Sequence, residues 1–504
     1  MSSSSLVSLV PSLEERNEVQ TRDSYLYTLS LIKKLKKFST AADNNFSSNY
    51  SPGKNHYEVQ EPKANLALLF TSHAEQRESK KFNSDHAFDP LELINKFKKP
   101  STTFYAPFTS NYSTTATKSY TLQGIKVNPY GSREEKTSYV ITGTNGSAVS
   151  AGGIGELYVG AIDGKSTSAG SGSGQWISFN VPFDGATGTS CYGPDILSAG
   201  NGPGGIGAIA LVGTWTNSSA NIIGFYYEGS LNQLKFGASN PKQFKSFQAI
   251  TSDQLLAKYT YLHSVDGGYA VGNFSTVPGY VGLFLNSGPN SGSYIYDPKS
   301  NSQTNAVYKD PNYTYHSLFG IWLNNNNSYT VAGGGSNAAL LADSGLALKK
   351  LSGLGLGLPQ DAVFGKGMLA DIDPLTGKVE NEKYYNYQND SGNQVFTHFQ
   401  GIYYAGDGVY EVPFDALTST GEFSIGIAYV KRQENGAFSD KALWHTFQAP
   451  QAGLPGYLIS NDSVAGAGSV GALLNASTTN GLSLTTFAST SDTQAYLFAA
   501  QYLH

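Results

Sequence analysis

Short strands that open with glycine recur along most of this chain, and this recurrence limits the possible fold more than any other feature. Five such anchors can be aligned, and a weaker sixth follows: GELYVG (Gly155 to Gly160), GFYYEG (Gly224 to Gly229), GLFLNS (Gly282 to Ser287), GMLADI (Gly367 to Ile372), GIAYVK (Gly426 to Lys431) and LSLTTF (Leu482 to Phe487). Successive anchor glycines are 58 to 85 residues apart. Such a period is long for one turn of a solenoid, but it suits a multi-stranded unit with loop insertions.

Each anchor is accompanied by further predicted strands. A strand that ends in small residues precedes it, as in YVITGTNG from Tyr139 and IALVGTWT from Ile209. An earlier strand contains a Gly-Ile pair, as in LQGI, LFGI and FQGI. A fourth strand follows several anchors, as in QWISFNV near Trp176 and ALWHTFQA near Trp444. The unit is therefore predicted to be four short antiparallel strands.

A meander of this kind cannot bury both of its faces alone, and radial packing around a channel solves that problem. We therefore predict an all-β fold with a six-bladed β-propeller, and seven blades are the alternative count. A β-helix is the runner-up, disfavoured because its repeats should be shorter and more uniform. Composition agrees with strands and turns, because the chain has 56 Gly, 33 Tyr and 26 Phe but only 14% charged residues.

The N-terminal part differs in composition, so we divide the chain into an extension over residues 1–104 and a repeat domain over 105–504. The segment LIKKLKKFST (Leu31 to Thr40) recurs as LINKFKKPST (Leu93 to Thr102), and each copy has the apolar spacing of a short basic helix. Packing on the large domain is one role for these helices. Contact with an anionic surface or partner through lysines is the other: Lys33, Lys34, Lys36 and Lys37.

Charge, hydropathy and cysteine content exclude several classes of protein. A net charge of −5 does not suit a general nucleic-acid binder. No apolar run approaches the roughly 18 residues of a membrane span, so we expect a soluble chain. The single cysteine, Cys191, permits no internal disulfide and no thiolate metal site. The loop GNGPGGIG (Gly200 to Gly207) lacks the Gly-Lys-Ser/Thr of a phosphate-binding loop, and we predict no cofactor.

Three histidines lie in similar aromatic surroundings, and two of them are weak catalytic candidates. His316 lies four residues before Gly320, His398 lies three before Gly401, and His263 has no Gly-Ile pair after it. A one-residue offset turns side chains to opposite faces of a strand, so a three-histidine metal site is not predicted. His316 and His398 are therefore the candidate general bases.

The phrases GFYYEGSL, HSVDGGYAVGN and GIWLNNNNSYTVAGG, together with FTHFQGI, resemble a diffuse group of bacterial repeat proteins, mostly uncharacterised. The resemblance spans roughly residues 120 to 490 and leaves out the N-terminal part. It implies a propeller-like architecture. The group has no catalytic signature to place on this chain.

Because no catalytic constellation is evident, the preferred interpretation is a binding or interaction protein whose aromatic and Asn-rich loops or channel mouth hold a glycan, a small molecule or a protein. The candidate ligand-binding residues are Tyr315, Trp322, Asn325, Trp215 and Asp266. One alternative is an enzyme of hydrolase, lyase or isomerase type with a histidine at the channel mouth. The other is an assembly component that docks through the basic N-terminal segments.

Overall fold

The computed structural model describes residues 102–105, 108–110, 120–131, 137–146, 152–162, 172–234, 241–276, 291–313, 315–337, 365–387, 394–418, 423–447, 457–475 and 483–491. The chain divides into two compact units, residues 1–81 and 82–504, and all described residues belong to the second. The two predicted basic helices lie outside the described residues, so they stay a prediction. No helix of the described part is long and apolar enough to cross a membrane.

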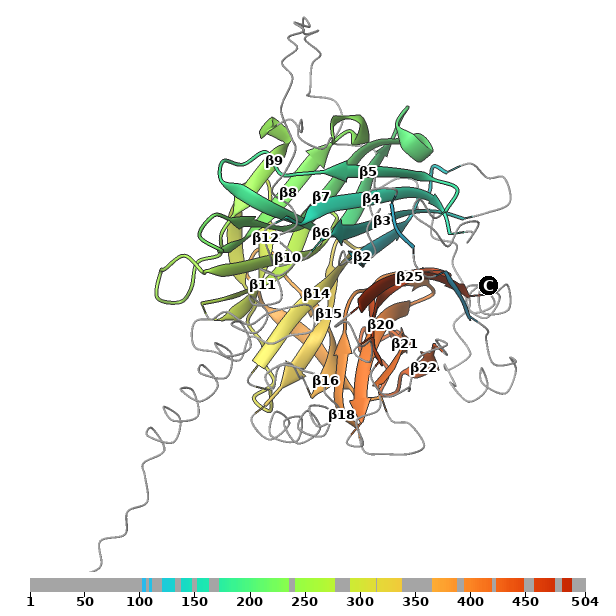
Figure 1. Ribbon diagram of the computed structural model, residues 1–504. Helices are drawn as coiled ribbons and strands as arrows, with labels where there is room; N and C mark the ends of the chain where they lie inside the picture. Colours follow the sequence, from blue (N-terminus) through green and yellow to red (C-terminus); the bar gives the residue numbers. More distant parts are fainter. Residues whose placement is uncertain are drawn as a thin grey trace, which may run out of the picture. The chain divides into compact units, whose positions relative to one another are not determined.

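Antiparallel meanders account for the described strands, and we number them in chain order (Figure 1). Meander 1 consists of β2 (Tyr120–Val127), β3 (Ser138–Asn145), β4 (Ile154–Ala161) and β5 (Gln175–Phe179). Meander 2 consists of β6 (Ala186–Ala199), β7 (Ile206–Asn217), β8 (Ile222–Gly229) and β9 (Phe244–Phe247). Meander 3 consists of β10 (Tyr259–Asp266), β11 (Tyr269–Ser275), β12 (Gly292–Asp297) and β13 (Ser302–Asn305).

The remaining strands continue the same pattern. Meander 4 consists of β14 (Tyr315–Leu323), β15 (Tyr329–Ser336), β16 (Lys366–Ile372) and β17 (Val379–Tyr385). Meander 5 consists of β18 (Gln394–Phe399), β19 (Tyr403–Gly406), β20 (Val409–Thr418), β21 (Phe423–Lys431) and β22 (Leu443–Thr446). Short 3-10 turns occur at η1 (Pro203–Gly205), η2 (Leu231–Gln233) and η3 (Pro241–Gln243).

The last sheet combines the first and last described strands of the chain. It consists of β23 (Tyr457–Ala465), β24 (Gly468–Asn475), β25 (Ser483–Ser491) and β1 (Thr102–Tyr105). β1 pairs antiparallel with β25, from Thr102 opposite Ser491 to Tyr105 opposite Ala488. We call this sheet the closing sheet, because its outer strand comes from the opposite end of the described chain.

The meanders pack on one another in a cycle. β6 contacts β2 and β10, β10 contacts β14, β18 contacts β15 and β16, β20 contacts β23, and β23 contacts β2. One parallel pair, Tyr259 with Ile222, also joins meanders 2 and 3 into an eight-stranded sheet. Apolar cores fill the spaces between neighbours, as where Leu157 of meander 1 packs with Phe225 of meander 2. The described part therefore has a propeller-like, all-β architecture, as predicted.

A β-bulge recurs near the middle of the first strand of each meander, where five of the strands shift register. In meander 5, β18 ends at the equivalent place, before Gln400. The residue at the bulge is followed by Gly or Ser in all six segments: QGI (from Gln123), YGP (from Tyr192), HSV (from His263), FGI (from Phe319), QGI (from Gln400) and DSV (from Asp462). Bulges re-aim side chains at the centres of such sheets.

The small residue after the bulge allows neighbouring inner strands to approach closely. A Cβ on Gly124 would lie 1.9 Å from the backbone oxygen of Tyr192 in meander 2, and one on Gly320 would lie 2.7 Å from the backbone carbon of Gly401. Backbone cannot yield as a flexible side chain can, so these two positions require glycine. The bulge motif thus sets the tight packing of the inner strands.

Candidate functional site

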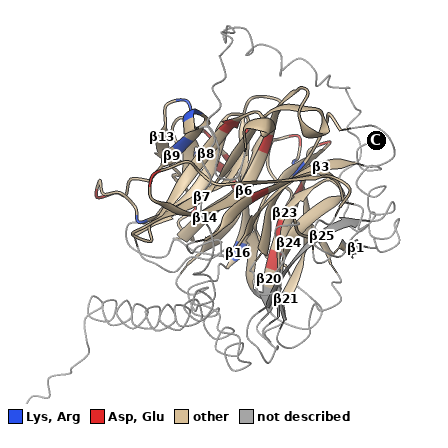
Figure 2. Ribbon diagram, turned by 45° about the horizontal axis from the view of Figure 1, so that its top comes forward, with Lys and Arg blue, Asp and Glu red and all other residues tan. Residues whose placement is uncertain are grey.

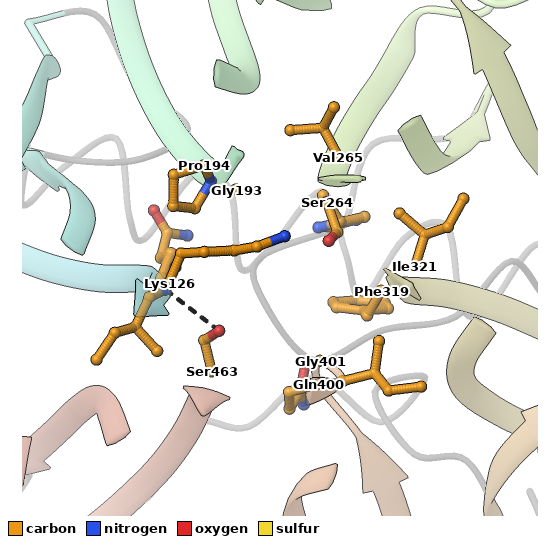
Figure 3. A pocket seen from close by; sticks show the side chains of 15 residues that line it. Lys126, Gly193, Pro194, Ser264, Val265, Phe319, Ile321, Gln400, Gly401 and Ser463 are labelled. Atoms are coloured by element: carbon orange, nitrogen blue, oxygen red, sulfur yellow. Dashed lines mark hydrogen bonds between the residues drawn. The ribbon is translucent and has the colours of Figure 1, made fainter. Parts of the chain in front are cut away.

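The inner strands surround a small cavity at the centre of the described sheets (Figure 3). Fifteen residues line it, and they come from the bulge segments of all six meanders, counting the closing sheet as the sixth. The cavity measures about 30 Å³. That volume holds about two water molecules. It is far below the roughly 300 Å³ at which small-molecule sites begin.

The side chain of Lys126, near the end of β2, reaches across this central space (Figure 3). Its ammonium lies 3.1 Å from Asp195 Oδ1 on β6 and 2.5 Å from Asp266 Oδ1 on β10. The other oxygen of Asp266 accepts a hydrogen bond from the backbone N–H of Leu323 on β14 at 2.6 Å. The cluster therefore ties together the inner strands of four meanders.

In this cluster, burial and the attraction between opposite charges act in opposite directions on the pKa of Lys126. Side-chain exposure is 18% for Lys126, 11% for Asp195 and 12% for Asp266. Burial works to lower the pKa of the Lys126 ammonium, but the charges of Asp195 and Asp266 outweigh it and hold that pKa above its ordinary value. Lys126 consequently stays charged and paired at physiological pH.

Two of the predicted ligand-binding residues meet at Lys126. Asp266 binds it directly, and the Trp322 ring lies 4.9 Å from its ammonium in a cation–π contact. Trp322 is buried and packs edge-on against Tyr403 at 5.3 Å. Both side chains are thus occupied by partners within the protein.

The other three predicted ligand-binding residues lie apart from this cluster. Asn325 is exposed in the turn that joins β14 to β15, and Tyr315 lies at the opposite end of β14. Trp215 on β7 packs against Phe183 at 5.2 Å and donates a hydrogen bond to Ser246 Oγ at 3.2 Å. The five residues do not converge on one site.

His398 lies at the centre of the described sheets together with His263. The Phe319 ring separates them, stacked on His263 at 4.0 Å and edge-on to His398 at 4.7 Å. His398 Nε2 is 2.9 Å from Ser317 Oγ. Burial lowers the pKa of each imidazole to about 3, and the neighbouring His263 lowers that of His398 further. Both rings are neutral at pH 7, and His398 is fully buried.

His316 belongs to a different group, at the start of β14. Its ring stacks on Tyr308 at 3.7 Å, and its Nε2 is 2.8 Å from the Tyr384 hydroxyl. That hydroxyl donates to Glu382 Oε2 at 2.9 Å, which completes a His–Tyr–Glu chain. Burial lowers the pKa of His316 to about 4. The chain could carry a proton, but His316 is only 7% exposed.

The described residues hold no group of three or more His, Cys, Asp or Glu side chains arranged to bind a metal ion. In the Lys126 cluster, one cation lies between two carboxylates, and sequence reasoning missed both Lys126 and Asp195. A signal for it exists, because the extended motifs QGIK, YGPD, HSVD and FGIW place Lys126, Asp195, Asp266 and Trp322 at one repeat position. The sequence comparison relies on the Gly-Ile pair, which three segments contain. The segments YGP and HSV lack this pair but have the same bulge.

Comparison with known proteins adds little to this geometry. No protein-family model matches the chain, and no curated protein matches it. A solved structure named provisionally as a gluconolactonase is similar at 9% identity, with a TM-score of 0.33, 78% of this chain covered and 92% of the other. A protein of unknown function from Dyadobacter fermentans is similar at 8% identity, with a TM-score of 0.41, 79% of this chain covered and 100% of the other. Neither score is high enough to assign this chain a fold or a function.

Proposed function

We propose that the chain is a six-bladed β-propeller that acts as a protein-interaction scaffold, with a partner protein docked beside β13 at the outer edge of the third blade. The cycle of five meanders plus the closing sheet supports the count of six blades. Propellers of this kind bury one face of each blade against the next and leave short outer edges. Such edges are available for contacts with other chains.

The centre of the molecule supports an interaction role over a catalytic one. The cavity there holds about two water molecules, and Lys126 crosses it (Figure 3). The nearby His398 is buried and neutral, so the enzyme alternative finds neither room for a substrate nor a base of suitable pKa at this position. A ligand of glycan size would have to bind elsewhere.

The observation that carries the proposal is the location of exposed apolar side chains. In the described part of the chain, the large apolar residues classed as exposed are Ile250 (44%), Leu255 (62%), Leu256 (64%), Val307 (57%) and Leu375 (75%). We call them the β13 margin, because all five belong to segments attached at the two ends of β13. Apolar residues concentrated in this way typically mark an interaction surface.

Hydrogen bonds hold these segments against β13. Ile250 donates its backbone N–H to Gln303 Oε1 at 2.7 Å, and Gln303 Nε2 donates to the Ile250 carbonyl at 2.8 Å. At the other end, the Val307 N–H donates to the Gly377 carbonyl at 2.8 Å, in the turn that carries Leu375. The β13 margin is therefore fixed in place before any partner binds.

The chemistry of the β13 margin favours a protein partner with an extended apolar segment. β13 is the terminal strand of its sheet, so one of its edges has no neighbouring strand among the described strands. An extended segment can pair with such an edge, and apolar side chains on either side add affinity. A glycan would leave the exposed leucines without a matching surface.

The test replaces Leu255 and Leu256 together by serine and compares this variant with a matched Leu255→Met, Leu256→Met control. Each protein serves as bait in an extract of its source cells, and captured proteins are quantified by isotope labelling. We expect at least about tenfold less capture by the serine variant, because desolvated anchors carry most of the binding energy. Equal capture by both variants would contradict the proposal. Thermal unfolding should be unchanged in either, since both side chains are exposed.

A further inference from the structure

The inter-blade contacts fall into two classes that differ in charge. Meanders 1 to 4 are joined by the Lys126 cluster, in which a cation balances the buried carboxylates. Meanders 4 and 5 are joined by Arg432, whose guanidinium donates to both oxygens of Asp371 and to Thr330 Oγ1. The closing sheet is different, because the carboxyls of β20 that face it have no described Lys or Arg partner, and neither does the buried Glu156 of meander 1, beside the segment that follows β1.

On the meander 5 side, two carboxyls of β20 face the closing sheet. Asp415 is fully buried and accepts hydrogen bonds from the Asn461 backbone N–H at 2.8 Å and from Gln400 Nε2 at 3.0 Å. Glu411 is 1% exposed, and its Oε2 has no hydrogen-bond partner within the described residues. Acidic positions on β20, beside β23 and β24, are marked red in Figure 2.

Among the residues that the structure describes, the groups around these two carboxyls supply no positive charge. Asp462 of β23 lies near Asp415, and the negative charge of Asp415 raises the pKa of Asp462 in addition to burial. The neighbour His398 is neutral at physiological pH. Glu411 lies opposite Tyr403 on β19 and Tyr429 on β21, and it faces the backbone of Gly466. An ionised carboxylate in such a place is strongly disfavoured, because its lost hydration is not replaced by a cation.

On the meander 1 side, Glu156 of β4 is fully buried beside the segment that follows β1. Ser178 Oγ donates to its Oε1 at 2.9 Å. Its Oε2 faces Ser110, Tyr120 and Asn145, and no cation is among these neighbours. Phe108, two residues before Ser110, packs in one core with Val470 of the closing sheet and Tyr158 of meander 1.

We propose that the closing sheet is an acid latch: protonated carboxyls of Glu156, Glu411 and Asp415 hold it between its neighbours, and their ionisation loosens it while the other sheets stay packed. The latch does not depend on the β13 margin. It gives the ring one interface pair that opens before the rest, at the sheet in which β1 and β25 meet.

The direction of the pH dependence follows from linkage. Burial raises the pKa of Glu156 and of Asp415 to about 7, and that of Glu411 to about 8. The ordinary pKa values of these groups, reached in the unfolded chain, are about 4. Folded groups with raised pKa values contribute stability that is fully present below pH 4 and is lost as pH rises through 7 to 8. The latch is therefore closed in mild acid and opens in alkali.

Hydrogen exchange of the full-length protein tests the latch, measured at pH 6 and pH 9 and corrected for the intrinsic rate. Protection of β24 and β25 should fall at least about tenfold more than that of β7 and β15, because the closing sheet opens alone. The Glu156→Gln, Glu411→Gln, Asp415→Asn variant, in which no latch carboxyl can ionise, should keep its pH 6 protection at pH 9. The exposed Glu380→Gln control should behave as wild type.

Three results would overturn the latch. Protection of the closing sheet could be the same at both pH values, or it could fall equally in all sheets of the wild type. The third is a variant with all three latch carboxyls replaced by amides that loses protection as the wild type does. If the variant does not fold, the wild-type comparison among sheets still decides, because it needs no substitution.

Discussion

At the residue scale, ion pairs of the described structure differ in burial: one cluster is buried at the centre, and other pairs are exposed. Lys126 is buried between Asp195 and Asp266, and it spans the centre of the sheets. Removing one member of a buried ion pair leaves the remaining charge without a partner, and this strongly lowers the free energy of unfolding. Replacing the whole pair by apolar residues of similar volume has a much smaller effect. By contrast, Lys309 and Glu380 form an ion pair with side-chain exposures of 56% and 48%. Exposed pairs contribute little to stability.

Replacing Lys126 by methionine should lower the free energy of unfolding by about 3 kcal/mol, because two carboxylates lose their cation in a largely buried place. Replacing Lys309 by methionine should lower it by less than about 1 kcal/mol. Urea unfolding followed by tryptophan fluorescence measures both. Equal effects of the two substitutions would contradict the prediction that the Lys126 cluster stabilises the fold more than an exposed ion pair does.

At the scale of elements, most strands were predictable, because each strand is short and its pattern is local. The predicted anchors from Gly155, Gly224, Gly367 and Gly426 lie in β4, β8, β16 and β21. The weak sixth anchor lies in β25. The anchor from Gly282 lies outside the described residues, and β12 (Gly292–Asp297) fills its place in meander 3. These strands could be predicted from local sequence, because turn residues and the alternation of apolar and polar residues are recognisable within a few positions.

The bulge motif was harder to predict, because glycine is only one of the residues that allow it. Serine follows the bulge at Ser264 and Ser463, and proline follows Gly193. The search for Gly-Ile pairs therefore gives no match at His263. In the structure, His263 is nevertheless the bulge residue of its strand, as Gln123 and Phe319 are of theirs. Contacts between inner strands, which no local pattern records, decide which small residue each blade needs.

The same motif gives a matched pair of glycine substitutions, one in each QGI segment. Gly124→Ala should lower the free energy of unfolding by about 3 kcal/mol, because its Cβ would lie 1.9 Å from the Tyr192 oxygen. Gly401→Ala should cost less than about 1 kcal/mol, because its Cβ would meet only ordinary contacts from 3.4 Å outward. Thermal unfolding of both variants is the measurement. A larger loss for Gly401→Ala would contradict the packing of the inner strands.

At the scale of the whole molecule, the closure that we propose depends on one pairing between distant parts of the described chain, β1 with β25. β1 is only four residues long, TTFY, and the sequence prediction placed its first residues in the N-terminal extension. A strand so short has no periodicity of its own, and pairing with β25 cannot be read from local pattern. The predicted site was affected in the same way, because Lys126, Asp195 and Asp266 come from three different meanders.

Closure is also the feature on which the functional proposals depend. In the proposed closed ring the centre is filled, and the proposed binding therefore lies at an outer edge, the β13 margin. Glu411 faces the closing sheet at Gly466, and Glu156 lies in meander 1 beside Ser110 of the segment that follows β1. An open chain of meanders would expose the edge of β25 and provide no latch.

The most direct test of closure is a disulfide between β1 and β25, made by replacing Thr103 and Thr490 by cysteine. These residues are Cα partners in the register, and opposed residues of antiparallel strands lie within disulfide range. The native Cys191 should not compete, because it is fully buried and its thiol pKa is raised by burial. Mild oxidation followed by peptide mass spectrometry should show an intramolecular link between the two strands. A Thr103→Cys, Ser483→Cys control, at the far end of β25, should show none. Absence of the link in the first pair, or links only between molecules, would contradict the closed ring.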